Sequence, residues 1–368
     1  MDQVSIVPIG LPNFTMRRID YLIVGQGLAG SALAWDLIQR GKSVVVFDEP
    51  GSNRSSAISA GLFNPITGRV MTKTWRADIL FPYLNNFYAH AEAVTKRKFF
   101  HPLPIYRPFL SAEEMQQWKK KSQSEEVKNF LLAFHDAPSF VDLVHNDFGG
   151  IEIALSGYLN VTSWMTAVRD HLISLNSYKS ERFDESQLVV DEDVCYQDLI
   201  AAQIIFCNGV FCLQTKWFHW IPLKPLKGET LQVRISIGRD KIFSRGVFLV
   251  PSTDEEIYTV GSTYVHPPFS EGPTQAGRDD MSQKLQVLVR PSFEIVHQDW
   301  GIRPTTPDRK PILGAHPANK NVIIFNGLGT KGVSLAPYFA HQLADWLEGK
   351  GDLLTEVNIN RFKALYSG

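Results

Sequence analysis

Apolar and polar positions repeat with a helical period in some stretches of this chain and with a strand-like pattern in others. The N-terminal part combines both: an apolar run at residues 21–24, a helical pattern at 31–40 and a second apolar run at 43–47 that leads into Asp48. Short runs without polar positions are typical of strands buried on both faces, and glycines between such a run and a helix mark a tight turn. These residues therefore predict a strand–turn–helix–strand unit of the kind found in parallel sheets.

The rest of the chain predicts a second unit of this type and a different architecture in between. The patterns predict helices at residues 80–94, 111–134, 161–175 and 333–347, strands at 203–209 and 321–325, and a strand pair at 139–156. Between residues 228 and 264, apolar and polar positions alternate in short runs separated by Gly and Pro, which indicates an antiparallel sheet. We therefore predict an α/β fold: a Rossmann-like nucleotide-binding domain interrupted by an α+β domain that is built on an antiparallel sheet.

The predicted domain boundaries follow from this interruption. We assign residues 17–90, 145–222 and 296–368 to the nucleotide-binding domain, and residues 91–144 and 223–295 to the second, substrate-binding domain. Residues 1–16 are expected to be an N-terminal extension, either disordered or preceding the natural start at Met16. The functional site is expected at the junction of the two domains, where ligand sites commonly lie.

The glycine turn has the spacing of a dinucleotide-binding fingerprint. Gly25, Gly27 and Gly30 form a Gly-x-Gly-x-x-Gly pattern directly after the first strand, and Asp48 follows about 20 residues later. The first glycine permits the tight turn, the second lets the backbone approach a pyrophosphate, and the third lets helix and strand pack closely. The helix N-terminus offers N–H groups and a partial positive charge to the phosphates, and Asp48 is placed to bind an adenosine ribose.

Composition and charge exclude few functions. The chain has 368 residues, 44% of them apolar, and a formal net charge of −1, so no global attraction to nucleic acid or to an anionic membrane is indicated. Its three cysteines lack a metal-ligand spacing, so no metal site is expected, and their sparse, odd count suits a reducing, cytoplasmic compartment. The apolar stretch 4–11 is too short and too often broken by proline to predict a transmembrane span.

Further segments accompany the glycine turn in a characteristic order. They are residues 55–61, GYLN at 157–160, NG at 208–209, KGE at 227–229, GSTY at 261–264, WGIRP at 300–304 and the loop 327–332. From residue 20 to residue 346 this order resembles the FAD-dependent amino-acid oxidase family, which includes D-amino acid oxidase, glycine oxidase and sarcosine oxidase. The resemblance implies non-covalently bound FAD, held by residues from these segments: Gly25, Gly27, Leu28, Ala29, Gly30, Asp48, Ser56, Gly61, Asn208, Gly209, Gly327, Leu328, Gly329, Thr330, Lys331 and Gly332.

The same resemblance implies roles for Arg303 and for the loop 327–332. Arg303 is expected to bind the substrate carboxylate, for which its planar, permanently charged fork is suited; the alternative is a structural salt bridge. The loop 327–332 is expected to direct a helix N-terminus at the pyrimidine end of the flavin, with Lys331 either adding charge there or remaining solvated. From their aromatic character, Tyr264, Phe63 and Trp75 are expected to form a wall over the flavin, where Tyr264 and Trp75 would bind the substrate, unless they are ordinary core residues.

The function implied is oxidation of the C–N bond of an amino acid or N-substituted glycine by hydride transfer to flavin N5. The flavin performs the chemistry, so no catalytic base is assigned. The partner is then a small carboxylate-bearing amine. A secondary resemblance, in residues 61–65 and the C-terminal half, is to the oxidase domain of the bifunctional tRNA wobble-uridine modifying enzyme, which would make carboxymethylaminomethyl-uridine in tRNA the substrate. The remaining alternatives are a non-catalytic flavin-binding protein and a nicotinamide-dependent dehydrogenase.

Overall fold

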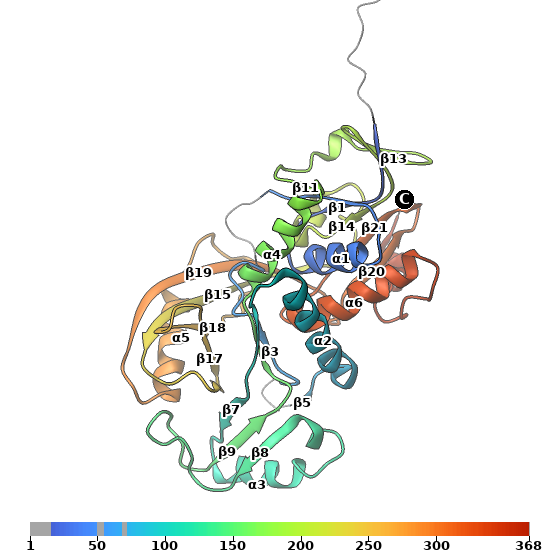
Figure 1. The fold of residues 1–368 in the computed structure, drawn as a ribbon. Coiled ribbons are helices and arrows are strands. Elements are labelled where there is room, and N and C mark those ends of the chain that lie inside the picture. The colour runs from blue at the N-terminus through green and yellow to red at the C-terminus, as the bar shows by residue number, and fades with distance from the viewer. Residues whose placement is uncertain (1–15, 50–54, 68–71, 368) are drawn as a thin grey trace, which may run out of the picture.

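The computed structural model describes residues 16–49, 55–67 and 72–367, so residues 1–15 of the predicted extension lie outside the described part. Figure 1 shows two regions side by side, one built around β1 and β14 and the other around β15, β17 and β18. The predicted combination of an α/β layer with a second region on an antiparallel sheet is confirmed.

The first sheet is largely parallel and carries the glycine turn. Its central strands β1 (Arg17–Val24), β2 (Val44–Phe47), β14 (Leu199–Phe206) and β21 (Asn319–Asn326) run parallel to one another. Among the described residues it has eight strands, the others being β11 (Tyr178–Lys179), β12 (Val189–Val190), β13 (Val194–Tyr196) and β20 (Ile312–His316). All four residues of β2 are buried, as expected for a strand covered on both faces.

One face of this sheet is covered by helices. They are α1 (Leu28–Gln39), α4 (Val161–Ser174) and α6 (Gly332–Leu347), and α2 (Ala77–Thr95) packs on α6. Helix α1 packs on both α4 and α6, and the rings of Trp35 in α1 and Trp164 in α4 meet edge to face at 5.8 Å. No helix in the described part of the chain combines the length and the apolar character that crossing a membrane requires.

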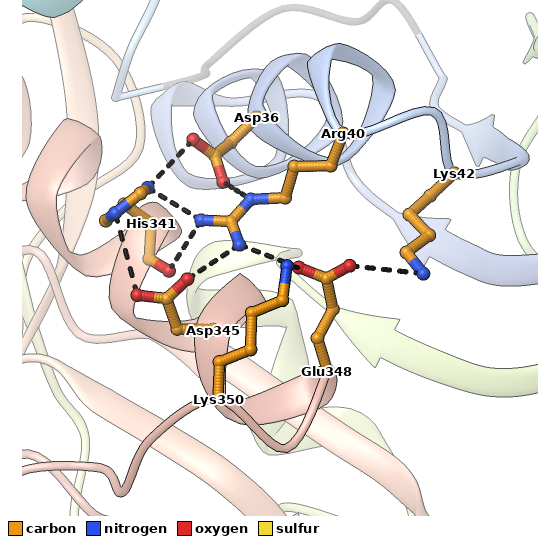
Figure 2. Close-up of polar contacts among 7 residues, drawn as sticks. All are labelled: Asp36, Arg40, Lys42, His341, Asp345, Glu348 and Lys350. Carbon is orange, nitrogen blue, oxygen red and sulfur yellow. Dashed lines mark hydrogen bonds and ion pairs between the residues drawn. The ribbon is translucent and has the colours of Figure 1, made fainter.

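The C-terminal ends of α1 and α6 are tied together by an ion network (Figure 2). The guanidinium of Arg40 donates to the carboxylates of Asp36, Asp345 and Glu348 at 2.7, 2.6 and 2.8 Å. His341 lies on the other side of Arg40, within 3.3 Å of Asp36. The network joins the two helices at their C-terminal ends. Their N-termini, at the opposite ends, face the predicted cofactor.

The second sheet is mostly antiparallel. Within the described residues it has eight strands, in the order β19 (Phe293–Thr305), β15 (Lys224–Ile235), β18 (Ile257–Gly261), β17 (Val247–Pro251), β16 (Ile242–Arg245), β7 (Ile105–Pro108), β9 (Gly150–Ile153) and β8 (Leu131–His135). Helix α5 (Gln275–Leu288) covers one face and contributes Met281, Leu285 and Leu288 to a core of its own. The opposite face is turned toward the first region.

Shorter strands connect the two regions. A three-stranded sheet consists of β3 (Leu62–Phe63), β10 (Gly157–Leu159) and β6 (Phe100–Pro102), and β4 (Ile66–Thr67) pairs with β5 (Thr72–Lys73). The alternation at 228–264 was correctly interpreted as antiparallel strands. The predicted helix at 111–134 is wrong beyond Lys121, where α3 (Ala112–Lys121) ends. The apolar run that begins at Phe130 instead forms β8 at the sheet edge, because pairing with β9 and burial of Phe130 outweigh local helical preference.

Two other predictions need correction. The strand pair at 139–156 is absent from the described structure: only β9 forms there, and it pairs with β7 and β8. Two predicted domain boundaries also differ from the sheet pairing. Strand β9 was placed in the nucleotide-binding domain but belongs to the second sheet, and so does β19 up to Thr305, although the boundary was set at residue 296.

Candidate active site

The glycine turn joins β1 to α1 with its backbone exposed to a ligand. Gly27 is the N-cap of α1 and supplies no side chain to cap the first helical turn; the N–H of Leu28 donates to the hydroxyl of Ser56 instead. Gly30 lies inside the first turn, because the helix begins at Leu28 and not at the predicted residue 31. A Cβ on Gly30 would overlap the carbonyl oxygen of Gly25, so only glycine lets the helix start this close to the strand.

Asp48 fixes the turn and lies at the end of β2, as predicted. Its Oδ1 accepts a hydrogen bond from the backbone N–H of Gln26 at 2.9 Å, and its side chain is buried. The hydroxyl of Tyr178 lies 3.4 Å from Oδ2. The carboxylate thus holds the glycine turn in shape and lies beside the position predicted for the ribose.

The loop 327–332 brings a second helix N-terminus to the first. A Cβ on Gly332 would lie 2.8 Å from Cδ1 of Leu28, so α6 begins against the start of α1. Asn326 supports the loop: its side chain accepts from the N–H of Gly327 and donates to the carbonyl of Gly209, both at 2.8 Å. The predicted segments around Gly27, Gly209 and Gly332 are therefore neighbours in space.

Lys331 is the N-cap residue of α6 and is not a solvated lysine. Its ammonium donates to the hydroxyls of Thr67 and Thr74 at 3.3 and 3.2 Å. Burial lowers the pKa of Lys331, and the charge of Arg309 lowers it further. Among the described residues its partners are hydroxyl groups and no carboxylate, so the ammonium adds positive charge to the start of this helix.

The remaining predicted cofactor residues line the same neighbourhood. The Oγ of Ser56 accepts from the N–H of Leu28 at 3.2 Å and lies 3.2 Å from where a Cβ on Gly27 would be. Gly61 lies against the backbone of Leu159, which leaves no room for a side chain. Asn208 follows β14 beside the glycine turn, and its buried Oδ1 has no hydrogen-bond partner among the described residues.

Arg303 lies on the face of the second sheet that is turned toward the first region. It is in β19, and its guanidinium rests directly on Gly228 of β15, where a Cβ would overlap it. Gly228 pairs with Gly301, and a Cβ on Gly301 would lie 3.1 Å from Cα of Ser55 and 3.0 Å from Ile58. Side chains two residues apart in a strand share a face, so Arg303 and Gly301 face the loop that contains Ser56.

The charge of Arg303 lacks an anionic partner within the described chain. Its Nη1 donates to the carbonyl oxygen of Thr263 at 3.2 Å, and its guanidinium lies 5.2 Å from the ring of Tyr264. No described carboxylate lies within ion-pair distance of it, which argues against the structural salt bridge. Burial lowers the pKa of Arg303, yet an arginine stays charged at neutral pH. An anion is the natural complement to such a group.

The predicted aromatic residues have different surroundings. Tyr264 is 62% exposed and lies next to Arg303. Trp75 stacks on Phe339 of α6, with ring centroids 5.7 Å apart, and its indole N–H donates to Glu356. Phe63 is 1% exposed and stacks on Phe100, with ring centroids 5.3 Å apart, as a core residue does.

The supporting residues of Arg303 carry only a weak signal in the sequence. Gly228 and Thr263 belong to the KGE and GSTY segments, but no spacing indicates that one lies under the guanidinium or that the other accepts from it. Both positions follow from strand pairing, since Glu229 and Thr263 are joined across neighbouring strands.

These residues fit an FAD molecule. Two helix N-termini, a side-chain-free cradle at Gly27 and a buried carboxylate at Asp48 match the pyrophosphate and the ribose. FAD, when bound, supplies a flavin ring that accepts two electrons from a substrate. The face that bears Arg303 is then the wall of the second region nearest to the cofactor.

Comparison with known proteins shows the family to which the chain belongs. The sequence profile of the family described as FAD dependent oxidoreductase (DAO) matches residues 20–346. The chain is 24% identical to the bifunctional protein ThiO/ThiG of Trichormus variabilis over 94% of its length, and 24% identical to the bifunctional protein MnmC of Leptospira borgpetersenii over 89%. The crystal structure of glycine oxidase from Geobacillus kaustophilus superposes with a TM-score of 0.75 at 19% identity, covering 92% of this chain and 96% of that one.

The extent of these matches differs. The chain spans 55% of the ThiO/ThiG protein and 57% of the MnmC protein, that is, about half the length of each. The likeness to the glycine oxidase structure extends over nearly all of both chains and concerns the fold.

Proposed function

We propose that this chain, which belongs to the DAO family of FAD dependent oxidoreductases, oxidises the C–N bond of an amino acid or an N-substituted glycine. The observation that supports this substrate class is Arg303. Its guanidinium is largely buried, has no carboxylate partner among the described residues and faces the segment at Ser55. A small carboxylate would complete its hydrogen bonds as a bidentate pair.

In this proposal the protein orients the substrate and the cofactor supplies the oxidant. Arg303 would hold the carboxylate and so orient the α-carbon, beside the exposed ring of Tyr264, which lies 5.2 Å from the guanidinium. FAD, when bound, would accept the hydrogen of the α-carbon as hydride, and the oxidised substrate would leave as an imine that hydrolyses in water. The starts of α1 and α6 stabilise negative charge on the cofactor through their N–H groups.

The test is reduction of the bound flavin without oxygen. A panel of glycine, N-substituted glycines, and D- and L-amino acids is mixed with the FAD-bound protein, and loss of the oxidised-flavin absorbance is followed. Each compound is paired with the amine that lacks its carboxylate. We expect reduction by at least one carboxylate-bearing compound and at least tenfold slower reduction by its amine partner, since one lost charged pair corresponds to more than about 1.4 kcal/mol. Equal rates for both partners would refute the carboxylate site, and no reduction by any compound would favour a non-catalytic flavin-binding protein.

A second candidate is oxidation of carboxymethylaminomethyl-uridine in tRNA. It is supported by the relative named tRNA 5-methylaminomethyl-2-thiouridine biosynthesis bifunctional protein MnmC, which aligns with 89% of this chain. Its substrate would present the same carboxymethyl-amine group to Arg303. Flavin reduction by tRNA that carries the modified uridine, at micromolar concentration and with no reduction by free amino acids, would replace the first candidate with this one.

A further inference from the structure

A buried ion pair lies directly behind the substrate-facing side of the second sheet. Lys227 and Glu229 flank Gly228 in β15, and their side chains are 1% and 0% exposed. Because side chains alternate along a strand, both point away from the face on which Arg303 rests against Gly228. The ammonium of Lys227 lies 3.3 Å from Oε1 of Glu229 and 5.2 Å from the ring of Trp300.

The pair holds one particular segment, residues 263–274, which connects β18 to α5. The ammonium of Lys227 donates to the carbonyl oxygens of Ser270 and Gly272 at 3.0 and 2.6 Å. The carboxylate of Glu229 accepts from the backbone N–H and the hydroxyl of Thr274 at 2.9 and 2.8 Å. It also accepts from Gln298 at 2.7 Å, and the same amide donates to the carbonyl of Thr274. The far end of the segment is thus fixed by side chains of the sheet, besides the hydrogen bond by which Thr274 caps α5.

The near end of this segment forms part of the site around Arg303. The backbone of Val265 pairs with that of Lys227 in both directions at 3.0 Å, and the hydroxyl of Thr263 accepts from the N–H of Glu229 at 2.9 Å. The carbonyl oxygen of Thr263 accepts from Arg303, and the ring of Tyr264 lies against that guanidinium. Any shift of residues 263–265 therefore moves two of the groups that orient Arg303.

We propose that Lys227 and Glu229 are positioning residues for the substrate carboxylate and set its affinity by holding residues 263–265 against Arg303. This inference rests on the proposed function of Arg303. A buried ion pair adds little net stability, because desolvation offsets most of the attraction, and fixing one arrangement is its best-attested use. Removal of either charge leaves the other unpaired in the core, and segment 263–274 must then rearrange to solvate it.

The experiment compares carboxylate binding with flavin chemistry. Acetate, an unreactive carboxylate, is titrated into the oxidised FAD-bound protein, and its dissociation constant is read from the flavin absorbance. KM and kcat are measured with the best substrate of the panel. For Glu229→Gln and Lys227→Met we expect a rise of about tenfold or more in the acetate dissociation constant and in KM, the usual scale for a supporting shell, with kcat changed less than about threefold.

The matched control is Glu152→Gln. Glu152 is buried in β9 of the same sheet and pairs with Lys241 at 3.2 Å, but it makes no described contact with residues 263–274. We expect its acetate affinity to equal that of the wild type. Hydrogen exchange provides a second readout: backbone amides of residues 263–274 should exchange faster in Glu229→Gln and not in Glu152→Gln. If either single variant fails to retain FAD, the double variant Lys227→Met/Glu229→Leu, which leaves no unpaired charge, is tested in its place.

The outcomes separate the two proposals. Wild-type protein that binds acetate, together with a Glu229→Gln variant of equal affinity and equal exchange, overturns the positioning role and leaves the role of Arg303 intact. Wild-type protein that binds neither acetate nor any carboxylate substrate refutes the proposed function, and the inference falls with it. Loss of kcat with unchanged KM also overturns the inference, because the pair would then act on the chemistry and not on substrate position.

Discussion

The guanidinium of Arg303 occupies the space that a side chain at Gly228 would need. The two residues lie on adjacent strands, β19 and β15, and share the face that is turned toward the cofactor region. The guanidinium therefore packs on the backbone of Gly228, and it is confined between this backbone, the carbonyl of Thr263 and the ring of Tyr264. This confinement makes the orientation of Arg303 testable without changing Arg303 itself.

Substitution of Gly228 should weaken substrate binding and leave FAD binding unchanged. In Gly228→Ala the new methyl group displaces the guanidinium, so we expect KM to rise by about ten- to a hundredfold, equivalent to roughly 1.4–2.8 kcal/mol, with FAD still bound. Steady-state kinetics and flavin absorbance of the purified variant check this. Gly351→Ala is the control, since nothing lies within 4 Å of a Cβ at that position. An unchanged KM in Gly228→Ala would show that the guanidinium is free to move aside.

The effect of substituting Arg303 on KM and kcat/KM should depend on the geometry of the side chain that replaces it. Arg303→Lys keeps the charge but loses the fork, so KM should rise strongly with FAD retained. Arg303→Ala should cost more, on the order of 2–5 kcal/mol in kcat/KM, because the substrate carboxylate is left unpaired. Anaerobic flavin reduction at subsaturating substrate measures both. Wild-type rates in the two variants would remove the main support for a carboxylate-bearing substrate.

The second and third glycines of the turn should respond differently to the same change. Among the described residues a Cβ on Gly27 would meet only Ser56, with its Oγ at 3.2 Å, whereas a Cβ on Gly30 overlaps the backbone of Gly25. Gly27→Ala should therefore fold normally and lose FAD affinity by at least tenfold, because the methyl group holds the pyrophosphate away from the backbone. Gly30→Ala should lower the thermal midpoint of the FAD-free protein as well. Circular dichroism melts and FAD titration distinguish these results, and equal FAD affinity in Gly27→Ala and wild type would place the pyrophosphate elsewhere.

Removal of the Asp48 carboxylate should weaken cofactor binding through two contacts. Asp48→Ala loses both the predicted ribose contact and the acceptor for the N–H of Gln26, so we expect FAD affinity to fall by roughly 1–3 kcal/mol. Asp48→Asn keeps one oxygen that can accept from the N–H of Gln26, so its FAD affinity should fall by less. Equilibrium dialysis against FAD measures both. Full FAD retention by the alanine variant would place Asp48 outside the cofactor site.

The ion network of Figure 2 predicts a defined pH dependence of stability. Hydrogen bonds from Lys350, Arg40 and Lys42 lower the pKa of Glu348 from its ordinary value of 4.5 to about 2. A carboxylate with a depressed folded-state pKa contributes stability above its unfolded pKa and loses it as the pH falls. The thermal midpoint of Glu348→Gln should therefore be lower than that of the wild type at pH 7, and the difference should shrink steadily from pH 4.5 downward. A difference that stays constant to pH 3 would contradict this role for the ionised carboxylate.

The periodicity of apolar residues and the spacing of glycines were enough to predict the elements that depend on local sequence. The unit from β1 to Asp48, the helix α6 and the antiparallel nature of residues 228–264 follow from periodicity and glycine spacing, and the structure has them. The segment from Phe130 to His135 was misassigned because its state depends on a partner strand, β9, whose position is set by the whole second sheet. We predicted the start of α1 too late because glycine is typical of turns. In the structure Gly30 is helical and packs closely against Gly25.

The site was predictable to the level of motifs and not of contacts. Arg303, Asp48 and the glycines of both loops were identified from their segments. The contacts of the site depend on which strands are adjacent, and that information is absent from any single segment. They include the packing of Arg303 on Gly228, its hydrogen bond to Thr263 and the hydroxyl partners of Lys331. The partners of Trp75 were equally out of reach of the sequence: its stacking on Phe339 and its hydrogen bond to Glu356 join segments far apart along the chain.

The contact between Leu28 and Gly332 has a consequence for the order of events during synthesis of the chain. The two residues belong to helices near opposite ends of the sequence, and each helix start supplies one side of the predicted cofactor cradle. A nascent chain that has emerged only as far as the second sheet presents the glycine turn without its counterpart. If FAD binds between both helix starts, its site is complete only once α6 has docked on α1. We therefore expect tight FAD binding to follow this docking and to hold the two helix starts together.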